Sequence, residues 1–299
     1  MSKRPILLFV VLLCLPGAAC TTSNHVPPDG AGATDQGGGA DRGGDLAISP
    51  DSSPSKDSQP TGYIDIFVKG DLAKPAFKDG LSGQTPQDYV IAISRYHILK
   101  SAADPSPVLC FDHGKNPSLA IIANDTKVGY CATSSIKSGL YTHGRTKIDW
   151  ATYKVKGVYH YLGQKLAGTF TFFRAYSDTV FDGKAYKAGH GTITFSGVTT
   201  VSIPVVYGPP PSVPGVAMKT QGGVFTMTFP FGKPLPIKQD NTKMHWARFH
   251  WKIGDAFRWA DTKLAGYQPG VWDVSPIVTS TEAVKLFGVS GFHVTSSVD

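Results

Sequence analysis

Short strand-like runs recur from residue 62 to the C-terminus, and they restrict the fold more than any other feature of the chain. Tyr63–Val68 alternates apolar and polar residues in part, while Tyr89–Leu99 and Val198–Val206 are rich in β-branched and aromatic residues. Gly, Pro and Asn-Asp turn signals separate these runs, and a strand every 8 to 12 residues or so is typical of sandwiches and barrels. No convincing helix of more than two turns is visible. The sequence therefore predicts an all-β fold, an antiparallel β-sandwich.

A proline-rich segment at residues 208–215 interrupts this pattern. Its four prolines remove backbone donors and fix φ, so the segment cannot lie inside a strand or a helix. We expect a β-sandwich domain over residues 62–207, with 208–215 as a linker. Residues 216–299 then form either a second β domain or the closing strands of the same sandwich, and the sequence leaves both arrangements open.

The N-terminus has the layout of an export signal. Lys3 and Arg4 precede an apolar run at residues 6–15, which is too short to span a bilayer. The following Gly17-Ala18-Ala19-Cys20 resembles a bacterial lipobox, although Gly17 stands where leucine is usual. We expect residues 1–19 to be a lipoprotein signal peptide and Cys20 to be lipidated. The alternative is an ordinary signal peptide cleaved nearby, with an incidental cysteine.

Residues 20–61 have the composition of a tether. Between Thr21 and Pro60 there is no aromatic residue, while glycines, prolines and six aspartates recur. Such a composition buries too little apolar surface to offset its ordering entropy, so we expect a disordered segment. Thr21, in place of an aspartate after the cysteine, favours the outer membrane. The expected location is therefore the cell envelope, with the membrane as partner through the N-terminal lipid.

Two cysteines remain once Cys14 leaves with the signal peptide and Cys20 carries lipid. Cys110 and Cys131 lie on predicted strands, and in an exported protein a disulfide between them is expected. A metal site or a nucleophilic thiol near Asp112 and His113 is the alternative. No family signature surrounds either cysteine.

The charge of the chain favours acidic partners outside the cell. Lys and Arg number 29 against 22 Asp and Glu, and six of those acids lie in the expected tether. A basic module attracts polyanions, here lipid phosphates, lipopolysaccharide or acidic polysaccharide. The alternative is that the charge serves solubility alone. No lysine-rich run or aromatic ribonucleoprotein motif is present, so no nucleic-acid partner is expected.

Aromatic residues concentrate in the C-terminal third. Four residues there lie beside predicted loops: Trp259, Tyr267, Trp272 and Arg258. The aromatic rings could stack on sugar rings, while Arg258 could bind the sugar hydroxyls. The alternative is that these rings belong to the core, as Trp246 and Trp251 are expected to do. Three aspartates of the same region could supply oxygen ligands to Ca²⁺, although their spacing matches no calcium loop: Asp255, Asp261 and Asp273.

Two stretches carry a resemblance to a known group of proteins. They are the Gly-, Pro-, Ser- and Asp-rich segment after the lipobox, and the C-terminal run Phe257-x-Trp259-x-Asp261 with Gly266–Val274. In these stretches the chain resembles uncharacterised surface lipoproteins of social and predatory, myxobacteria-like bacteria of the delta class. The resemblance implies a surface location and a β fold, and it brings no catalytic residue.

No catalytic motif distinguishes the chain. The sequence has no G-x-S-x-G, Walker or dinucleotide-binding pattern, no metal-spaced histidine pair, and a single glutamate, Glu282. We therefore nominate no catalytic residue. The expected function is binding of a glycan, a lipid head group or an envelope protein, with an envelope-polymer hydrolase or a purely structural envelope lipoprotein as alternatives.

Overall fold

A computed structural model describes residues 62–210, 212–213, 215–238 and 244–298. The signal peptide, Cys20 and the tether to residue 61 lie outside these ranges. The described residues form strands and two 3-10 helices, η1 (Thr133–Ser135) and η2 (Val278–Ser280), with no α-helix among them. Neither helical turn has the length and apolarity needed to cross a membrane.

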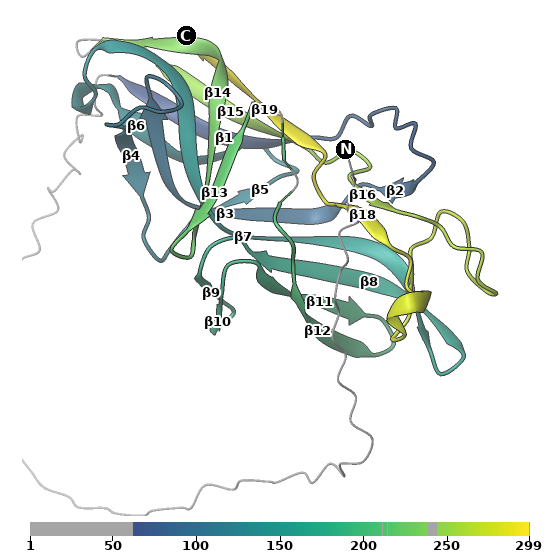
Figure 1. The fold of residues 1–299 in the computed structure, drawn as a ribbon. Coiled ribbons are helices and arrows are strands. Elements are labelled where there is room, and N and C mark those ends of the chain that lie inside the picture. The colour runs from purple at the N-terminus through teal and green to yellow at the C-terminus, as the bar shows by residue number, and fades with distance from the viewer. Residues whose placement is uncertain (1–61, 211, 214, 239–243, 299) are drawn as a thin grey trace, which may run out of the picture. The chain divides into compact units, whose positions relative to one another are not determined.

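Two large sheets contain most of the strands (Figure 1). The four-stranded sheet has the order β19-β15-β1-β6, and it is formed by β1 (Tyr63–Asp71), β6 (Thr126–Ala132), β15 (His245–Lys252) and β19 (Gly291–Val298). The ten-stranded sheet contains β3 (Gln87–Leu99), β4 (Val108–Asp112), β5 (Ser118–Ile121), β7 (Gly139–Tyr161), β8 (Gln164–Ala175), β11 (His190–Ser196), β12 (Thr200–Val206), β13 (Ala217–Gln221), β14 (Val224–Ile237) and β17 (Asp273–Val274).

Two small sheets complete the fold. One joins β18 (Val284–Phe287), β16 (Phe257–Trp259) and β2 (Ser82–Gln84), and the other is the hairpin of β9 (Thr179–Phe181) and β10 (Lys184–Tyr186). The all-β prediction is confirmed. Most pairings are antiparallel, but β1 pairs with β15 and β17 pairs with β7 in parallel.

The core lies between the two large sheets. Ile64, Ile66 and Val68 of β1 are fully buried, and Phe249 of β15 packs its ring 4.1 Å from Phe229 of β14. Gly144 allows β7 to pass beneath this cluster. A Cβ at that position would lie 2.7 Å from Phe229 Cζ and closer still to the Tyr96 hydroxyl oxygen, so a larger residue would force the rings apart.

The strands after the proline-rich segment join sheets that begin before it. β14 pairs with β7, and β15 pairs with β1, the first strand of the described chain. Residues 208–215 therefore do not separate one sheet from another.

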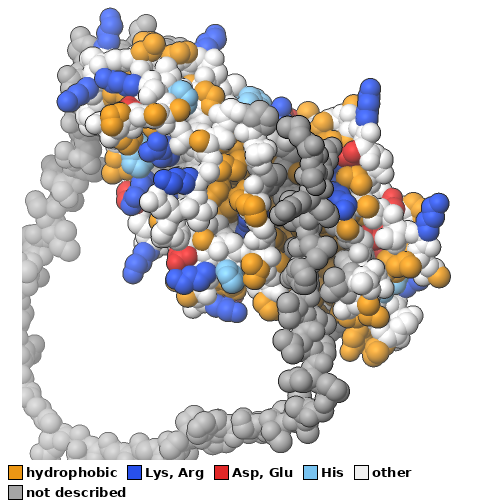
Figure 2. Space-filling model, viewed as in Figure 1, with side chains coloured by type: hydrophobic (Ala, Val, Ile, Leu, Met, Phe, Trp, Pro, Cys, Tyr) orange, Lys and Arg blue, Asp and Glu red, His pale blue; other side chains and the backbone are white. Residues whose placement is uncertain are grey.

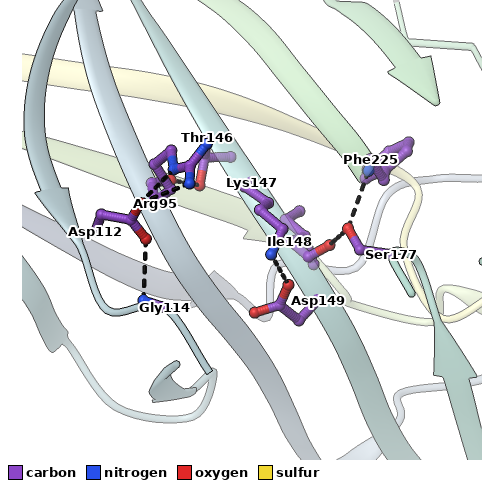
Figure 3. A network of polar contacts seen from close by, with 9 residues as sticks. All are labelled: Arg95, Asp112, Gly114, Thr146, Lys147, Ile148, Asp149, Ser177 and Phe225. Atoms are coloured by element: carbon purple, nitrogen blue, oxygen red, sulfur yellow. Dashed lines mark hydrogen bonds and ion pairs between the residues drawn. The ribbon is translucent and has the colours of Figure 1, made fainter. Parts of the chain in front are cut away.

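β7 is the longest strand, and its edges change partners along its length. Residues 139–147 pair with β14, and residues 150–161 pair with β8. Residues 148–149 fall between these two ladders, where the backbone groups need other partners. The Ser177 hydroxyl supplies one, because it donates to Ile148 O at 2.7 Å and accepts from Phe225 N at 2.9 Å (Figure 3).

Charged groups near this junction are paired with one another. Lys147 Nζ lies 2.7 Å from Asp149 Oδ1, and Arg95 Nη2 lies 2.6 Å from Asp112 Oδ2 (Figure 3). The Gly114 amide and the Arg95 guanidinium lower the pKa of Asp112 from its usual range. Because these charges bind each other, we assign them to the fold rather than to a reaction.

The predicted disulfide is confirmed. Cys110 of β4 is bonded to Cys131 of β6, with a Cα–Cα distance of 4.4 Å and a sequence separation of 21. β4 belongs to the ten-stranded sheet and β6 to the four-stranded sheet. The bond therefore links the two layers of the sandwich.

We predict that Ser177→Ala lowers the free energy of unfolding by about 2 kcal/mol or more, because it orphans a buried carbonyl and a buried amide. Ser94 is the matched control, since both serines are fully buried and Ser94 Oγ has no hydrogen-bond partner among the described residues. Ser94→Ala should leave stability unchanged or raise it. Urea denaturation of both variants checks this, and equal losses would contradict it.

We also predict that replacing Cys110 and Cys131 together by alanine lowers the free energy of unfolding by on the order of 3 kcal/mol. The bond restricts the unfolded chain, and its loss removes that restriction. Thermal unfolding with and without reductant measures the effect. Reductant should lower the Tm of the wild type and leave that of the double variant unchanged, and a wild type insensitive to reductant would refute the expectation.

Candidate functional site

The solvent side of the four-stranded sheet carries aromatic and cationic side chains in rows. Register places Thr295, Arg248, Phe67 and Lys127 in one row across β19, β15, β1 and β6. The neighbouring rows come from the same four strands. We call the whole set the outer face: Tyr63, Asp65, Phe67, Lys69, Lys127, Tyr130, Trp246, Arg248, His250, His293, Thr295 and Ser297.

Strand alternation produces this face. Successive side chains of a strand point to opposite sides, so the buried Ile64, Ile66 and Val68 leave the residues between them on the solvent side. On β15 the buried Ala247 and Phe249 do the same for Trp246, Arg248 and His250. Tyr130 is 51% exposed, so aromatic surface is available to a ligand.

Two cations of the outer face lie over aromatic rings. Arg248 Cζ is 4.8 Å from the Trp246 ring centroid and 5.1 Å from that of Phe67. Lys127 Nζ is 5.2 Å from the Tyr63 ring centroid and 5.6 Å from that of Tyr130. Attraction between a cation and a ring face stabilises these positions of the two side chains.

Carboxylates fix the same two cations in place. Arg248 binds Asp125 through Nε at 2.9 Å and Nη2 at 2.8 Å, and Lys127 Nζ lies 2.6 Å from Asp65 Oδ1. Lys69 is exposed and has no ion pair within the described ranges. It therefore leaves a positive charge available for an incoming anion.

Two histidines stack at one end of the outer face. His250 of β15 and His293 of β19 are register partners, with ring centroids 4.4 Å apart and an interplanar angle of 5°. His250 Nε2 is 2.9 Å from Thr295 Oγ1. Burial, and then the neighbouring His293, lowers the pKa of His250. The His250 ring is therefore neutral at pH 7 and offers a hydrogen bond rather than a charge.

Basic residues outnumber acidic ones in the chain, 29 Lys and Arg against 22 Asp and Glu. In Figure 2, Lys and Arg are spread over the face in view, whereas Asp and Glu are few. Glu282, the single glutamate, is buried, where its carboxylate accepts from the Thr262 and Asp273 amides at 2.8 Å each. Burial raises the pKa of Glu282. This carboxyl group therefore adds no negative charge to the surface.

The tryptophans predicted to form a sugar-binding surface are buried, and that expectation is wrong for them. Trp259 is fully buried, and its Nε1 donates to Asp261 Oδ1 at 3.0 Å. Trp272 is 3% exposed and packs against Phe170 and Phe257. Both rings belong to the core: Trp259 is the last residue of the buried strand β16, and Trp272 directly precedes the buried strand β17.

Arg258 and Tyr267, the other two residues of that expectation, lie apart from a common surface. Arg258 is buried, binds Asp79 and Leu81 O, and lies 4.0 Å above the Phe77 ring. Tyr267 is half-buried, and its hydroxyl donates to Ser280 O at 2.5 Å. Burial raises the pKa of Tyr267.

The three aspartates considered for Ca²⁺ each have separate partners. Asp255 binds Lys74 at 3.1 Å, Asp261 accepts from Ser82 Oγ at 2.5 Å, and Asp273 binds His160 at 2.5 Å. Across the described ranges no group of three or more His, Cys, Asp and Glu residues is arranged to hold a metal ion. The three carboxylates therefore do not form one site.

The residues of the outer face were not singled out by the sequence. Trp246 was expected in the core with Trp251, and only Trp251 is buried there. The available signal was the alternation in residues 245–252, which puts Trp246, Arg248 and His250 on one side of the strand and Trp251 on the other. Which side faces the core depends on β1 and β19, far away in the chain.

Comparison with known proteins gives no relative: no family model, curated protein or solved structure matches this chain.

Proposed function

We propose that this protein binds an acidic glycan on the outer face of its four-stranded sheet. The observation that supports this most directly is the row in which aromatic rings alternate with cations: Arg248, Phe67 and Lys127, flanked by Trp246 and Tyr130. Aromatic faces stack on the apolar faces of sugar rings. Lys69, which has no ion pair among the described residues, would bind carboxylates or sulfates on the same polymer.

The shape of the outer face fits an extended polymer. A sheet surface is open along its strands, and successive rows of side chains on one face are two residues apart on β1, β15 and β19. The ion pairs and cation–π contacts hold Arg248 and Lys127 in position before binding, which lowers the entropic cost of ordering them. A glycan chain can therefore lie across several rows at once.

The location that we propose is the bacterial cell envelope. Residues 1–19 would direct export, lipidated Cys20 would anchor the protein, and residues 20–61 would connect the anchor to the β-sandwich. The outer membrane is the proposed site of anchoring. Export is consistent with the Cys110–Cys131 disulfide, since such bonds persist in oxidising compartments.

We predict that Tyr130→Ala weakens binding of polygalacturonate about three- to tenfold, through loss of one stacking ring. Lys69→Gln should weaken binding further at low salt and less at high salt, because added ions screen an exposed charge. Isothermal titration calorimetry at two salt concentrations measures both effects. Lys219→Gln, which removes an exposed cation from β13 of the other sheet, is the matched control and should bind as the wild type does.

Neutral dextran and a single-stranded oligonucleotide complete this test. The proposal expects weak binding of both relative to polygalacturonate. Unchanged affinity in Tyr130→Ala and Lys69→Gln, or stronger binding of the oligonucleotide, would contradict it.

We predict that the mature protein begins at a lipid-modified Cys20, and that Cys20→Ala moves it from the membrane fraction to the soluble fraction. Mass spectrometry of the N-terminal peptide and fractionation of the expressing bacteria check this. An unmodified N-terminus on a wild-type protein found in the medium would overturn the anchoring proposal.

A further inference from the structure

A second surface lies at the far end of β7, away from the outer face. Here an open hollow of about 510 Å³ separates the tip of the β7–β8 hairpin from the loop that follows β17. Its lining includes His160, Tyr161, Leu162, Lys165, Pro276 and Ile277. This volume falls within the range of small-molecule sites. None of the residues that line the hollow belongs to β1, β6, β15 or β19.

At the tip of the β7–β8 hairpin, Leu162 is unusual in two respects: it has a left-handed backbone conformation, and its apolar side chain is exposed. Leu162 and Gly163 have φ of +50° and +77°, the left-handed values of a two-residue type I′ turn, where Asn, Asp or Gly is usual. Leu162 is also 84% exposed. The β9–β10 turn has nearly the same angles, +50° and +72°, and uses Asp182-Gly183. A leucine at such a position costs stability and requires another reason.

Further apolar side chains lie exposed near Leu162. Ile277 is 63% exposed and Tyr161 is 46% exposed, and both line the hollow. Hydrophobic side chains gather at the lower right of Figure 2, where Figure 1 shows the β7–β8 hairpin and η2. An exposed apolar cluster around a hollow is typical of a ligand site.

The floor of the hollow is polar and rigidly held. His160 Nε2 lies 2.5 Å from Asp273 Oδ1, and the other carboxylate oxygen of Asp273 accepts from Gln268 N at 3.0 Å. The Tyr267 ring packs 4.3 Å from the His160 ring. Since Asp273 engages Nε2, and Nδ1 has no hydrogen-bond partner within the described ranges, Nδ1 remains for a ligand.

The charge of the lining favours an anion. Lys165 is the cation there, and its Nζ would lie 3.1 Å from a Cβ on Gly266, which places the lysine against the opposite loop. No Asp or Glu is among the lining residues, because Asp273 lies behind His160. A phosphate or carboxylate at this position would meet one cation and one hydrogen-bonding ring.

We propose that this hollow binds an amphiphile with an anionic head group, either a phosphate or a carboxylate. The head group lies between Lys165 and His160, and the alkyl part covers Leu162 and Ile277. Such a ligand explains why an exposed leucine occupies a left-handed turn position directly beside an ordered His–Asp pair. The amphiphile proposal is independent of the glycan proposal, since the hollow and the outer face share no residue.

Dodecyl phosphate, kept below its micellar concentration, is the probe, and calorimetric titration of the purified full-length protein is the measurement. Leu162→Asn should weaken binding about tenfold or more through lost apolar contact, while its Tm stays equal to or rises above that of the wild type, because Asn suits the turn. Lys165→Gln should also weaken binding. Val198→Asn is the matched control, since Val198 is likewise 84% exposed and lies in the turn between β11 and β12. It should leave affinity unchanged.

A second arm offers the same head group in phosphatidylglycerol vesicles and distinguishes a free amphiphile from a bilayer. Binding of the monomer that is lost in Leu162→Asn and in Lys165→Gln supports the proposal, whether or not vesicles also bind. Binding to vesicles alone would mean that the tip inserts into a membrane and would overturn the proposal. Unchanged affinity for the monomer in Leu162→Asn, or an equal loss in Val198→Asn, would overturn it as well.

Discussion

The hydrogen-bonding edges of β7 organise this fold. A strand of 23 residues exposes a long row of amides and carbonyls on each side, and buried groups of this kind need partners. β14 and then β8 pair along one edge, while β3 and then β17 pair along the other. At the change from β14 to β8, the hydroxyl of the buried Ser177 donates to Ile148 O of β7 and accepts from Phe225 N of β14, where no strand pairs with that edge of β7. The amides of Tyr176 and Ser177 also donate to Asp149 O, so the carbonyls of both residues between the two ladders have partners.

The four-stranded sheet, the second layer, covers the apolar side chains that the ten-stranded sheet presents on one face. β3 and β14 present Tyr96 and Phe229 to the interior, and Phe249 of β15 packs on both rings. β1 enters beside β15 in parallel, which is possible because most of the chain lies between the two strands. The disulfide then joins β4 of one sheet to β6 of the other. The outer face is the side of this layer that the core does not use.

The two proposed binding surfaces depend on the same arrangement of charge. Several acidic side chains are paired with nearby cations, and those of Glu282 and Asp273 are enclosed in hydrogen bonds. Unpaired positive charge therefore remains at the surface beside apolar rings on the outer face and beside Leu162 at the hollow. Anionic ligands with an apolar component suit both surfaces, a glycan chain on the open sheet and an amphiphile in the hollow.

The sequence by itself determined the properties that depend on local pattern. The spacing of β-branched and aromatic runs predicted strands and no long helix. The presence of two cysteines on predicted strands of an exported protein predicted the disulfide between them. Trp246 and Trp251 were both expected in the core; alternation in residues 245–252 puts them on opposite sides of the strand, without saying which side faces solvent. Only the tertiary structure decided that. Trp259 and Trp272 lie near loops in sequence, yet distant strands bury them, and His160 meets Asp273 across 113 residues of chain. Burial and long-range pairing are set by whichever strands become neighbours, and a pattern within one strand carries no information about its neighbours.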